Sequence, residues 1–255
     1  LIAQHPLPRR DRSRMLVVDR KTRDIKHFPF ERLVEFMRPG DLVVLNDTKV
    51  IPARVWGTSG DAKVEFLFLR ELDPGSWEVL CRPAKRVRPG GSVRFLAGVE
   101  ARVKGPGEEG RRVLDFGKAG VRAFLDNFGY APLPPYIKRA REDRDGRAED
   151  LDRYQTVFAK HEGAIAAPTA GLHFTEETLR DLKAKGVDIR RVTLEVGLAT
   201  FQPVRADFVD GHRMLEERYS VTAGAARAVN AAKSGGRPVT AVGHTVVPTR
   251  ESAWR

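Results

Sequence analysis

The chain of 255 residues is long enough for one large domain or two smaller ones, and its 41% hydrophobic content allows a substantial core. No apolar run approaches the roughly 18 residues of a membrane-spanning helix. The net charge of +11 comes from 45 basic residues, 33 of which are arginines. Because arginine binds phosphate bidentately and stacks on bases, this excess favours an RNA-binding protein, although a coding bias or a thermophile's surface predicts it equally well.

The cysteine and histidine content argues against disulfides and metal sites. A single cysteine, Cys81, excludes internal disulfides and zinc sites built on several thiolates. The six histidines are far apart in the sequence, so we predict no metal site. The sequence starts without an apolar signal core, and a lone reduced cysteine fits the cytosol. We therefore expect a cytoplasmic protein that does not contact membranes.

The first part of the chain predicts alternating strand and helix. Residues 14–19 and 41–47 are short β-branched runs bounded by turn formers, which predict buried strands. Between them, hydrophobic residues recur at helical spacing over 30–40 and end at Pro39-Gly40. A strand, a helix and a second strand predict a βαβ unit of a parallel sheet.

A different pattern begins near residue 55. Short strand-like runs follow one another at about 8–12 residues, separated by Gly and Pro, which predicts a small antiparallel β-barrel. These runs cover residues 63–72, 76–83, 92–98, 100–105 and 111–116. We expect a helix over 119–128 and then an exposed, charged linker over 138–153.

After the linker, the alternation of helix and strand resumes. The segment FTEETLRDLKAKG (174–186) predicts a helix with Thr175 as its N-cap and Gly186 at its end. Strands are predicted over 188–197 and 238–243, with a helix over 221–236 between them.

Together these elements predict an α/β main domain, layered with a mostly parallel sheet and helices, that carries an inserted small antiparallel β-barrel domain. The expected boundaries are 1–54 for the first part of the α/β domain, 55–148 for the barrel domain and 149–255 for the second α/β part.

Three segments that follow predicted strands would meet at one edge of the sheet, where open α/β sheets bind ligands. They are LNDTKVIPAR (45–54), the small-residue segment 153–175 and EVGLATFQPVR (195–205). Short polar residues in the first segment suit a ligand but also cap turns. Small residues in the second let a ligand approach the backbone, although they also suit packing. His173 stands before the helix capped by Thr175, whose N-terminal amides favour a polar ligand.

Other motifs are weaker. The loop CRPAKRVRPG (81–90) carries several cations, which could hold phosphates or simply be solvated. GPGEEG (105–110) matches a dinucleotide-binding pattern but joins two barrel strands, so we predict no nucleotide loop there. Cys81 lies in a strand-like run near Trp77, which predicts a buried, inert thiol.

Several long motifs resemble the S-adenosylmethionine:tRNA ribosyltransferase-isomerase family of queuosine biosynthesis. They are YQTVFAKHEGAIAAPTAGLHFT, LIAQHP, RDRSRMLVVDR, RPGDLVVLNDTKVIPAR, CRPAKR, PLPPYIKR and VGLATFQPVR, and the resemblance extends from Leu1 to about Ser252. It implies an enzyme that transfers the ribosyl part of S-adenosylmethionine to 7-aminomethyl-7-deazaguanine at the tRNA wobble position. Isomerisation then gives epoxyqueuosine, with release of adenine and methionine.

The resemblance also implies partners and residue roles. S-adenosylmethionine would be a consumed cosubstrate, with no permanently bound cofactor, and the partner would be the anticodon stem-loop of tRNA; we expect a monomer. The residue types suit His173, His212 and Asp47 to proton transfer. Candidates for RNA phosphate contacts are Arg82, Lys85, Arg86 and Arg205. Candidates for substrate and cosubstrate contacts are Asn46, Thr48, Arg54, Tyr136, Tyr154, Gln155, Thr169, Ala170, Gly171, Phe174, Gly197, Thr200 and Phe201.

Two alternative functions stay open at this point. Family chains continue past the end of this sequence with a further segment, so a non-catalytic RNA-binding module left by truncation is the second hypothesis. A small-molecule hydrolase that uses His173 is the third, although no Ser or Cys nucleophile motif accompanies it.

Overall fold

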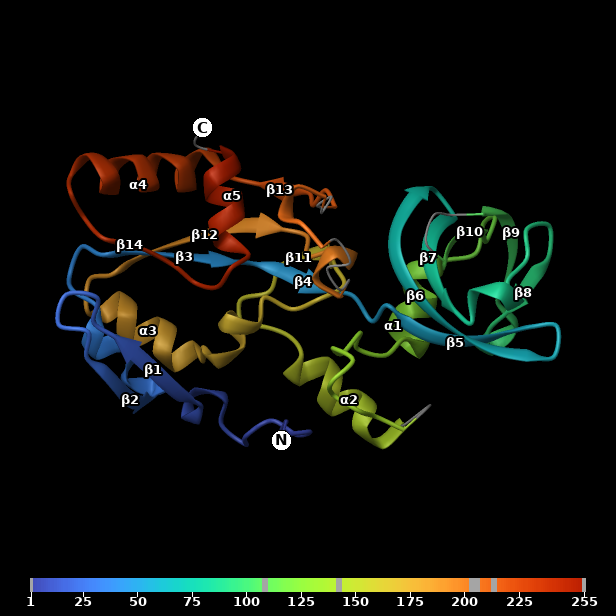
Figure 1. Ribbon diagram of the computed structural model, residues 1–255, viewed down its shortest axis with the longest axis horizontal. Helices are drawn as coiled ribbons and strands as arrows, with labels where there is room; N and C mark the ends of the chain where they lie inside the picture. Colours follow the sequence, from blue (N-terminus) through green and yellow to red (C-terminus); the bar gives the residue numbers. More distant parts are fainter. Residues whose placement is uncertain (1, 107–109, 141–143, 202–206, 212–214, 254–255) are drawn as a thin grey trace.

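The computed structural model describes residues 2–106, 110–140, 144–201, 207–211 and 215–253. Figure 1 shows two parts, a layered part with sheets and helices and a β-barrel beside it. The barrel strands follow one another in the chain, between β4 and β11 of the layered part. This confirms a barrel together with parallel sheets and helices, while the domain boundaries near residues 54 and 148 stay predictions.

The main sheet has the strand order β13-β12-β3-β14. Its strands are β3 (Leu42–Asn46), β12 (Asp188–Leu194), β13 (Tyr219–Ser220) and β14 (Val239–Ala241). Strands β12 and β14 run parallel to β3, and only the short β13 is antiparallel to its neighbour within the described part. Beside this sheet, β4 (Thr48–Val50) pairs in parallel with β11 (His161–Ala164).

Helices cover both faces of the main sheet, as Figure 1 shows. They are α3 (Glu176–Ala184) on one face and α4 (Ala223–Ser234) with α5 (Val246–Ala253) on the other. Leu42 and Val44 of β3 share a core cluster with residues of α4 and α5. Val43 and Leu45 share another with residues of α3. Because both faces are covered, all residues of β3 are buried, which is typical of a parallel sheet.

The predicted βαβ unit at the start of the chain is wrong. β1 (Arg14–Val18) pairs antiparallel with β2 (Ile25–Pro29) in a separate hairpin, and its Leu16 and Val18 are exposed. The hairpin forms because the Asp19 carboxylate accepts hydrogen bonds from the backbone amides of Lys21 and Thr22, which closes a turn. The predicted helix after it is the short 3₁₀ helix η2 (Phe30–Phe36).

The predicted charged linker is also wrong in part, because it contains α2 (Arg144–Arg153). Arg139 lies before this helix and forms an ion pair of 2.8 Å with Asp150. Arg147 donates hydrogen bonds to the carbonyls of Gly129 and Asp126 at the end of α1. These charged side chains therefore attach α2 to neighbouring segments and are not merely exposed to solvent.

The barrel closes in the order β10-β7-β6-β5-β8-β9. Its strands are β5 (Arg54–Ser59), β6 (Ala62–Asp73), β7 (Ser76–Arg82), β8 (Ser92–Arg94), β9 (Glu100–Pro106) and β10 (Arg111–Asp115). The five strand-like runs of the sequence correspond to β6–β10, and β5 begins the barrel. The predicted helix is α1 (Val121–Phe128). The sequence prediction of the barrel is confirmed.

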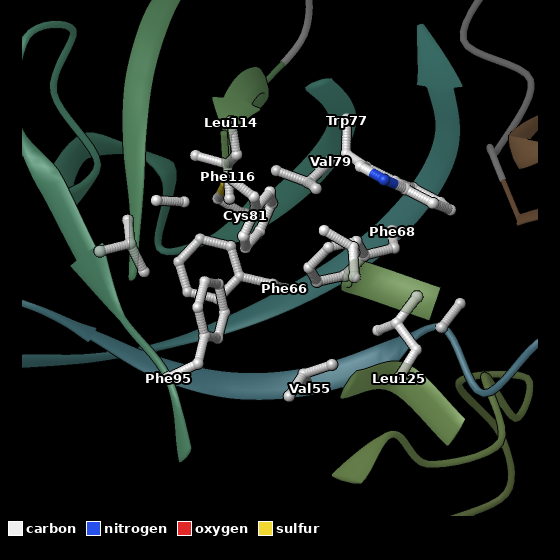
Figure 2. Close-up of a cluster of buried hydrophobic side chains, with 14 of the residues drawn as sticks. Val55, Phe66, Phe68, Trp77, Val79, Cys81, Phe95, Leu114, Phe116 and Leu125 are labelled. Atoms are coloured by element: carbon white, nitrogen blue, oxygen red, sulfur yellow. The ribbon is translucent and has the colours of Figure 1, made fainter. Parts of the chain in front are cut away.

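Aromatic side chains fill the barrel, as Figure 2 shows. Phe95 packs against Phe66 and Phe116 inside the barrel and against Phe124 of α1, with ring centroids 5.0–5.7 Å apart. Cys81 lies in the same core, where burial raises the pKa of its thiol to about 12. The prediction that this thiol is buried is confirmed, and its inertness stays a prediction.

Gly129 is where the chain leaving α1 passes the chain entering β5. A Cβ atom there would lie 1.9 Å from the carbonyl oxygen of Pro52, which belongs to the backbone and cannot rotate away. We expect Gly129→Ala to lower the free energy of unfolding by about 1–3 kcal/mol or more, measured by denaturant unfolding. Gly105→Ala is the control, because no atom lies near its Cβ position, and it should change stability by less than about 0.5 kcal/mol. Equal effects of the two substitutions on stability would contradict the close approach of Gly129 to the Pro52 carbonyl.

Candidate active site

A cavity of about 650 Å³ lies at the carboxyl ends of β12 and β14. Both strands run parallel to β3, so the segments that leave them reach the same edge of the sheet, as expected of an open α/β sheet. We name it the strand-end cavity. Its walls come from four segments of the chain: Pro134–Tyr136, Tyr154 with Ala166–Ala170, Val196 with Thr200, and Gly243–Thr245.

Aromatic rings and hydroxyl groups face the strand-end cavity. Tyr136 is half exposed, whereas Tyr154 is buried, and burial raises the pKa of its phenol to about 12. Tyr154 is therefore protonated at neutral pH and provides a neutral ring. Thr169, Thr200 and Thr245 also line the cavity. The Thr245 Oγ1 atom is shielded from solvent and has no hydrogen-bond partner among the described residues.

A second cavity of about 340 Å³ adjoins the first, and Ala170 lines both. We name it the His173 cavity. His173 ends the 3₁₀ turn η6 (Thr169–His173), and its ring lies 5.3 Å from that of Phe30. Phe174 also lines this cavity, but its ring is buried in the core against Phe30 and Phe158. Only part of the His173 side chain is packed, which leaves the imidazole accessible from this cavity.

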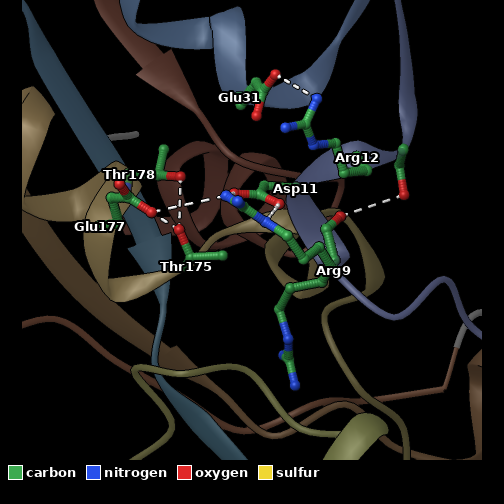
Figure 3. A network of polar contacts seen from close by, with 9 residues as sticks. Arg9, Asp11, Arg12, Glu31, Thr175, Glu177 and Thr178 are labelled. Carbon is green, nitrogen blue, oxygen red and sulfur yellow. Dashed lines mark hydrogen bonds and ion pairs between the residues drawn. The ribbon is translucent and has the colours of Figure 1, made fainter.

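Figure 3 shows an ion-pair network between the segment before β1 and the start of α3. Arg9 pairs with the buried Asp11 at 2.8 Å and with Glu177 of α3 at 3.6 Å. Thr175 caps α3 by accepting a hydrogen bond from the Thr178 amide, which confirms the predicted N-cap. The segment that leads to β1 is thus tied to the start of the helix that follows His173.

This network predicts a dependence of stability on pH. The hydrogen bond from Arg9 lowers the pKa of Asp11 below its usual value, so the pair stabilises the fold at pH 7 and loses its effect as the pH falls below about 4. We expect Asp11→Asn to lower the free energy of unfolding by about 1–3 kcal/mol at pH 7, and the difference from the parent chain to shrink at lower pH. Asp61→Asn in an exposed turn is the control. A difference that stays constant down to pH 3 would contradict this account.

Most candidates from segment 45–54 and its neighbourhood bind the protein's own backbone. Asn46 bonds both the amide and the carbonyl of Leu194 at 3.0 Å, which joins β3 to β12. The Gln155 side chain accepts a hydrogen bond from the amide of Val50 and donates one to its carbonyl, both at 3.1 Å. These residues and the fully buried Thr48 line neither cavity.

Asp47 and Arg54 are also engaged within the fold. Asp47 is buried, accepts a hydrogen bond from Thr193 at 2.7 Å and lies 3.8 Å from the imidazole of His161. Arg54 donates to the carbonyl of Leu133 and pairs with Glu65. Neither lines the strand-end cavity or the His173 cavity, so the roles given to Asp47 and Arg54 stay predictions.

The remaining candidates are spread over the chain. Gly171 packs closely against Phe158, whose ring would lie 2.9 Å from an added Cβ. The Gly197 amide donates a hydrogen bond to the carboxylate of Glu217. The candidate phosphate contacts of the barrel are exposed and form no ion pair with the described residues. These are Arg82, Lys85 and Arg86. His212, Arg205 and the side chain of Phe201 lie outside the described residues.

His244 and Thr245 line the strand-end cavity but were not among the residues predicted from the sequence. They directly follow the predicted strand 238–243, so the rule used for the other strand-end segments would have included them. Five of the expected contact residues do line the strand-end cavity: Tyr136, Tyr154, Thr169, Ala170 and Thr200.

The sequence matches the family model of the queuosine biosynthesis protein over residues 1–255. The chain belongs to this family. Its relatives from Staphylococcus aureus strains JH9 and MRSA252 are named S-adenosylmethionine:tRNA ribosyltransferase-isomerase. Each is 46% identical over 259 residues, which cover 100% of this chain and 74% of the relative. The family resemblance of the motifs is thereby confirmed, and the chain is an enzyme of queuosine synthesis.

A solved structure of the family is also similar. It is the S-adenosylmethionine tRNA ribosyltransferase of Thermotoga maritima, 32% identical, with a TM-score of 0.45; the match covers 100% of this chain and 70% of that one. Within the described residues, no helix is long and apolar enough to cross a membrane. No group of three or more potential metal ligands lies together in that same part of the chain.

Proposed function

We propose that the chain transfers the ribosyl part of S-adenosylmethionine to the aminomethyl group of 7-aminomethyl-7-deazaguanine at the wobble position of tRNA. The ribosyl group then isomerises to an epoxycyclopentanediol, which gives epoxyqueuosine and releases adenine and methionine. The observation that supports this proposal most is that residues from three motifs typical of the family line one cavity. They are PLPPY (132–136), APTA (167–170) and VGLAT (196–200).

The strand-end cavity suits the cosubstrate in size and chemistry. Its volume of about 650 Å³ lies in the range typical of small-molecule sites, with mostly apolar walls and a few polar groups. Tyr136 and Tyr154 offer rings for stacking on adenine, and Thr169 and Thr200 offer hydroxyls to the ribose. We place S-adenosylmethionine in this cavity, with no permanently bound cofactor.

The chemistry requires proton transfer near the ribose. The sulfonium acidifies the C5′ protons, so a base must remove one, and adenine leaves more readily when a ring nitrogen is protonated or hydrogen-bonded. His244 lines the strand-end cavity, and His173 lines the cavity that shares Ala170 with it. We assign proton transfer to these imidazoles, and Asp47 and His212 stay secondary candidates.

The RNA would bind across the barrel as well as at the cavity. Exposed cations of the barrel are available for the phosphates of an anticodon stem-loop, the partner that the wobble position requires. We further propose that the chain works as a monomer in the cytoplasm, where tRNA is modified.

The salt dependence of RNA binding tests the phosphate contacts. If Arg82, Lys85 and Arg86 contact phosphates, replacing all three by Ala should reduce the slope of log K against log salt by about two to three units. Filter binding of a labelled anticodon stem-loop at several salt concentrations measures this slope.

A matched triple substitution controls for the loss of net charge. Lys183, Arg227 and Lys233 lie on exposed positions of α3 and α4, and their replacement by Ala should leave the slope unchanged. Equal slopes for the barrel variant and the parent chain would show that Arg82, Lys85 and Arg86 are solvated and do not contact RNA phosphates.

Mass spectrometry of the RNA product tests the proposed reaction. An anticodon stem-loop that carries 7-aminomethyl-7-deazaguanine is incubated with the chain and S-adenosylmethionine, and free adenine is measured in parallel. We expect the RNA to gain the mass of the ribosyl-derived group as adenine appears. Bound but unmodified RNA would indicate a binding module, and adenine release with unmodified RNA would indicate a hydrolase; either result contradicts the proposal.

A further inference from the structure

A further pocket of about 210 Å³ lies on the barrel, between β5, β8 and the end of α1. It shares no lining residue with the strand-end cavity or the His173 cavity. Four aromatic residues and two cations contribute to its walls, and we name it the barrel pocket. They are Trp56, Phe95, Phe128 and Tyr130, with Lys63 and Arg94.

The aromatic walls of the barrel pocket are held rigidly. Tyr130 exchanges two backbone hydrogen bonds with Arg54, of 2.8 and 3.1 Å, and its ring meets that of Trp56 edge to face at 5.0 Å. Residue 57 is glycine, and a Cβ there would lie 2.9 Å from the Phe95 ring. Gly57 therefore lets the β5 backbone pack directly against the Phe95 ring, which fixes this wall of the pocket.

One polar atom of the pocket has no partner. The indole Nε1 of Trp56 is shielded from solvent and makes no hydrogen bond with any described residue. The indole N–H is only a donor, and a buried donor without an acceptor is unfavourable. Because this atom has almost no accessible surface, it is an unsatisfied donor of the fold and not a ligand contact. What the pocket offers a ligand is its aromatic walls, which suit the stacking of a nucleobase.

Cations gather around the pocket. In the barrel, Thr58 pairs with Lys63 on one side and with Arg94 on the other, so both cations lie at the same end of the strands. The Ser59 hydroxyl donates to the carbonyl of Arg86, which brings the loop with the candidate phosphate contacts to this end as well.

Two acidic residues near the pocket are paired with arginines. Glu65 pairs with Arg54 at 3.2 Å, and Glu100 pairs with Arg94 at 2.9 Å. Lys63 forms no ion pair with the described residues, so its charge is available to a phosphate. The pocket therefore combines aromatic walls with a cationic rim, as sites for single-stranded nucleic acid do.

The barrel pocket and the strand-end cavity are joined by one stretch of chain. Tyr130 lines the pocket, and Tyr136, six residues later, lines the cavity. Six extended residues span at most about 20 Å. An RNA whose modified base enters the strand-end cavity would therefore have other loop nucleotides close to the barrel pocket.

We propose that the barrel pocket binds one unstacked base of the substrate RNA, from a loop nucleotide other than the modified one. This inference rests on the proposed function, because it takes the tRNA loop as the ligand. Trp56 stacks on the base, while Lys63 holds an adjoining phosphate.

The test measures the affinity for a labelled anticodon stem-loop by fluorescence anisotropy. Trp56→Leu should weaken binding by about 5- to 150-fold without changing its salt slope, because a stacking contact and no charge is lost. Lys63→Ala should lower the slope by about one unit. Trp56→Phe should recover part of the affinity. Leu72→Ala, an exposed apolar residue of β6, is the control and should bind as the parent chain does.

Abasic RNAs separate a specific base contact from damage to the barrel. Each loop nucleotide in turn is replaced by an abasic residue. One such RNA should bind the parent chain more weakly and lose nothing further with Trp56→Leu, because the same contact is already absent. If Trp56→Leu weakens all these RNAs by the same factor, or binds like the parent chain, the proposal is overturned.

The mass-spectrometric assay distinguishes a failure of this inference from a failure of the proposed function. A parent chain that modifies the RNA while Trp56→Leu binds normally would refute the barrel pocket and leave the function intact. A base-specific loss at Trp56 with unmodified RNA would support the pocket and refute the reaction.

Discussion

Ala170→Phe is expected to lower the turnover of S-adenosylmethionine at least about 100-fold. Ala170 borders both the strand-end cavity and the His173 cavity, so a phenyl ring there must enter space assigned to the reacting ribose. Because the ring has a cavity to occupy, we expect the free energy of unfolding to change by less than about 1.5 kcal/mol. Single-turnover adenine release at saturating substrates measures the effect.

The control for this substitution is Ala223→Phe at the exposed start of α4, which lines neither cavity. It should turn over like the parent chain. Turnover by Ala170→Phe within a factor of about three of the control would show that the reaction takes place elsewhere in the protein.

His173→Ala should reduce turnover by about 10²–10⁴, the usual contribution of one acid–base group, while the affinity for RNA stays unchanged. The imidazole lines the His173 cavity and is only partly packed against Phe30, so it can reach a ligand. His173→Gln separates two roles. It should restore part of the activity if the imidazole only donates a hydrogen bond, and little if it transfers a proton.

The matched control is His27→Ala, because His27 is exposed on β2 and lines neither cavity. It should retain the turnover of the parent chain. Full activity in His173→Ala would remove this residue from the mechanism and leave His244 as the described imidazole in the strand-end cavity.

The barrel could be predicted from the sequence because local signals determine it. Its strands carry alternating buried side chains, and turns such as Gly75, with φ of +80°, need a residue that adopts positive φ. A Cβ on Gly75 would also lie 2.1 Å from the carbonyl of Gly117. The N-cap Thr175 and the end of α3 at Gly186 were predictable for the same reason.

The start of the chain and the charged linker could not be predicted in this way. β1 has the composition of a buried strand, but the turn at Asp19 directs it into a hairpin, where Leu16 is exposed. Helix α2 has little apolar patterning and depends on tertiary contacts, such as those of Arg147 with the end of α1. Hydrophobic periodicity carries no information about such contacts.

The site could be predicted only in part, because the same polar groups serve ligands and backbone equally well. Asn46 stands at the carboxyl end of β3, where a ligand contact was expected, yet its amide bonds Leu194 and completes the sheet. Tyr154, Thr169 and Thr200 do line the strand-end cavity. Only the fold decides which polar side chains remain free after the backbone groups have been paired.

A crystal structure of the chain with S-adenosylmethionine and the anticodon stem-loop tests most directly whether the strand-end cavity is the active site. We expect the adenosyl group between Tyr136 and Tyr154, with its ribose toward Ala170 and the modified base entering from the solvent side. A cosubstrate bound outside the strand-end and His173 cavities would contradict the assignment of the active site.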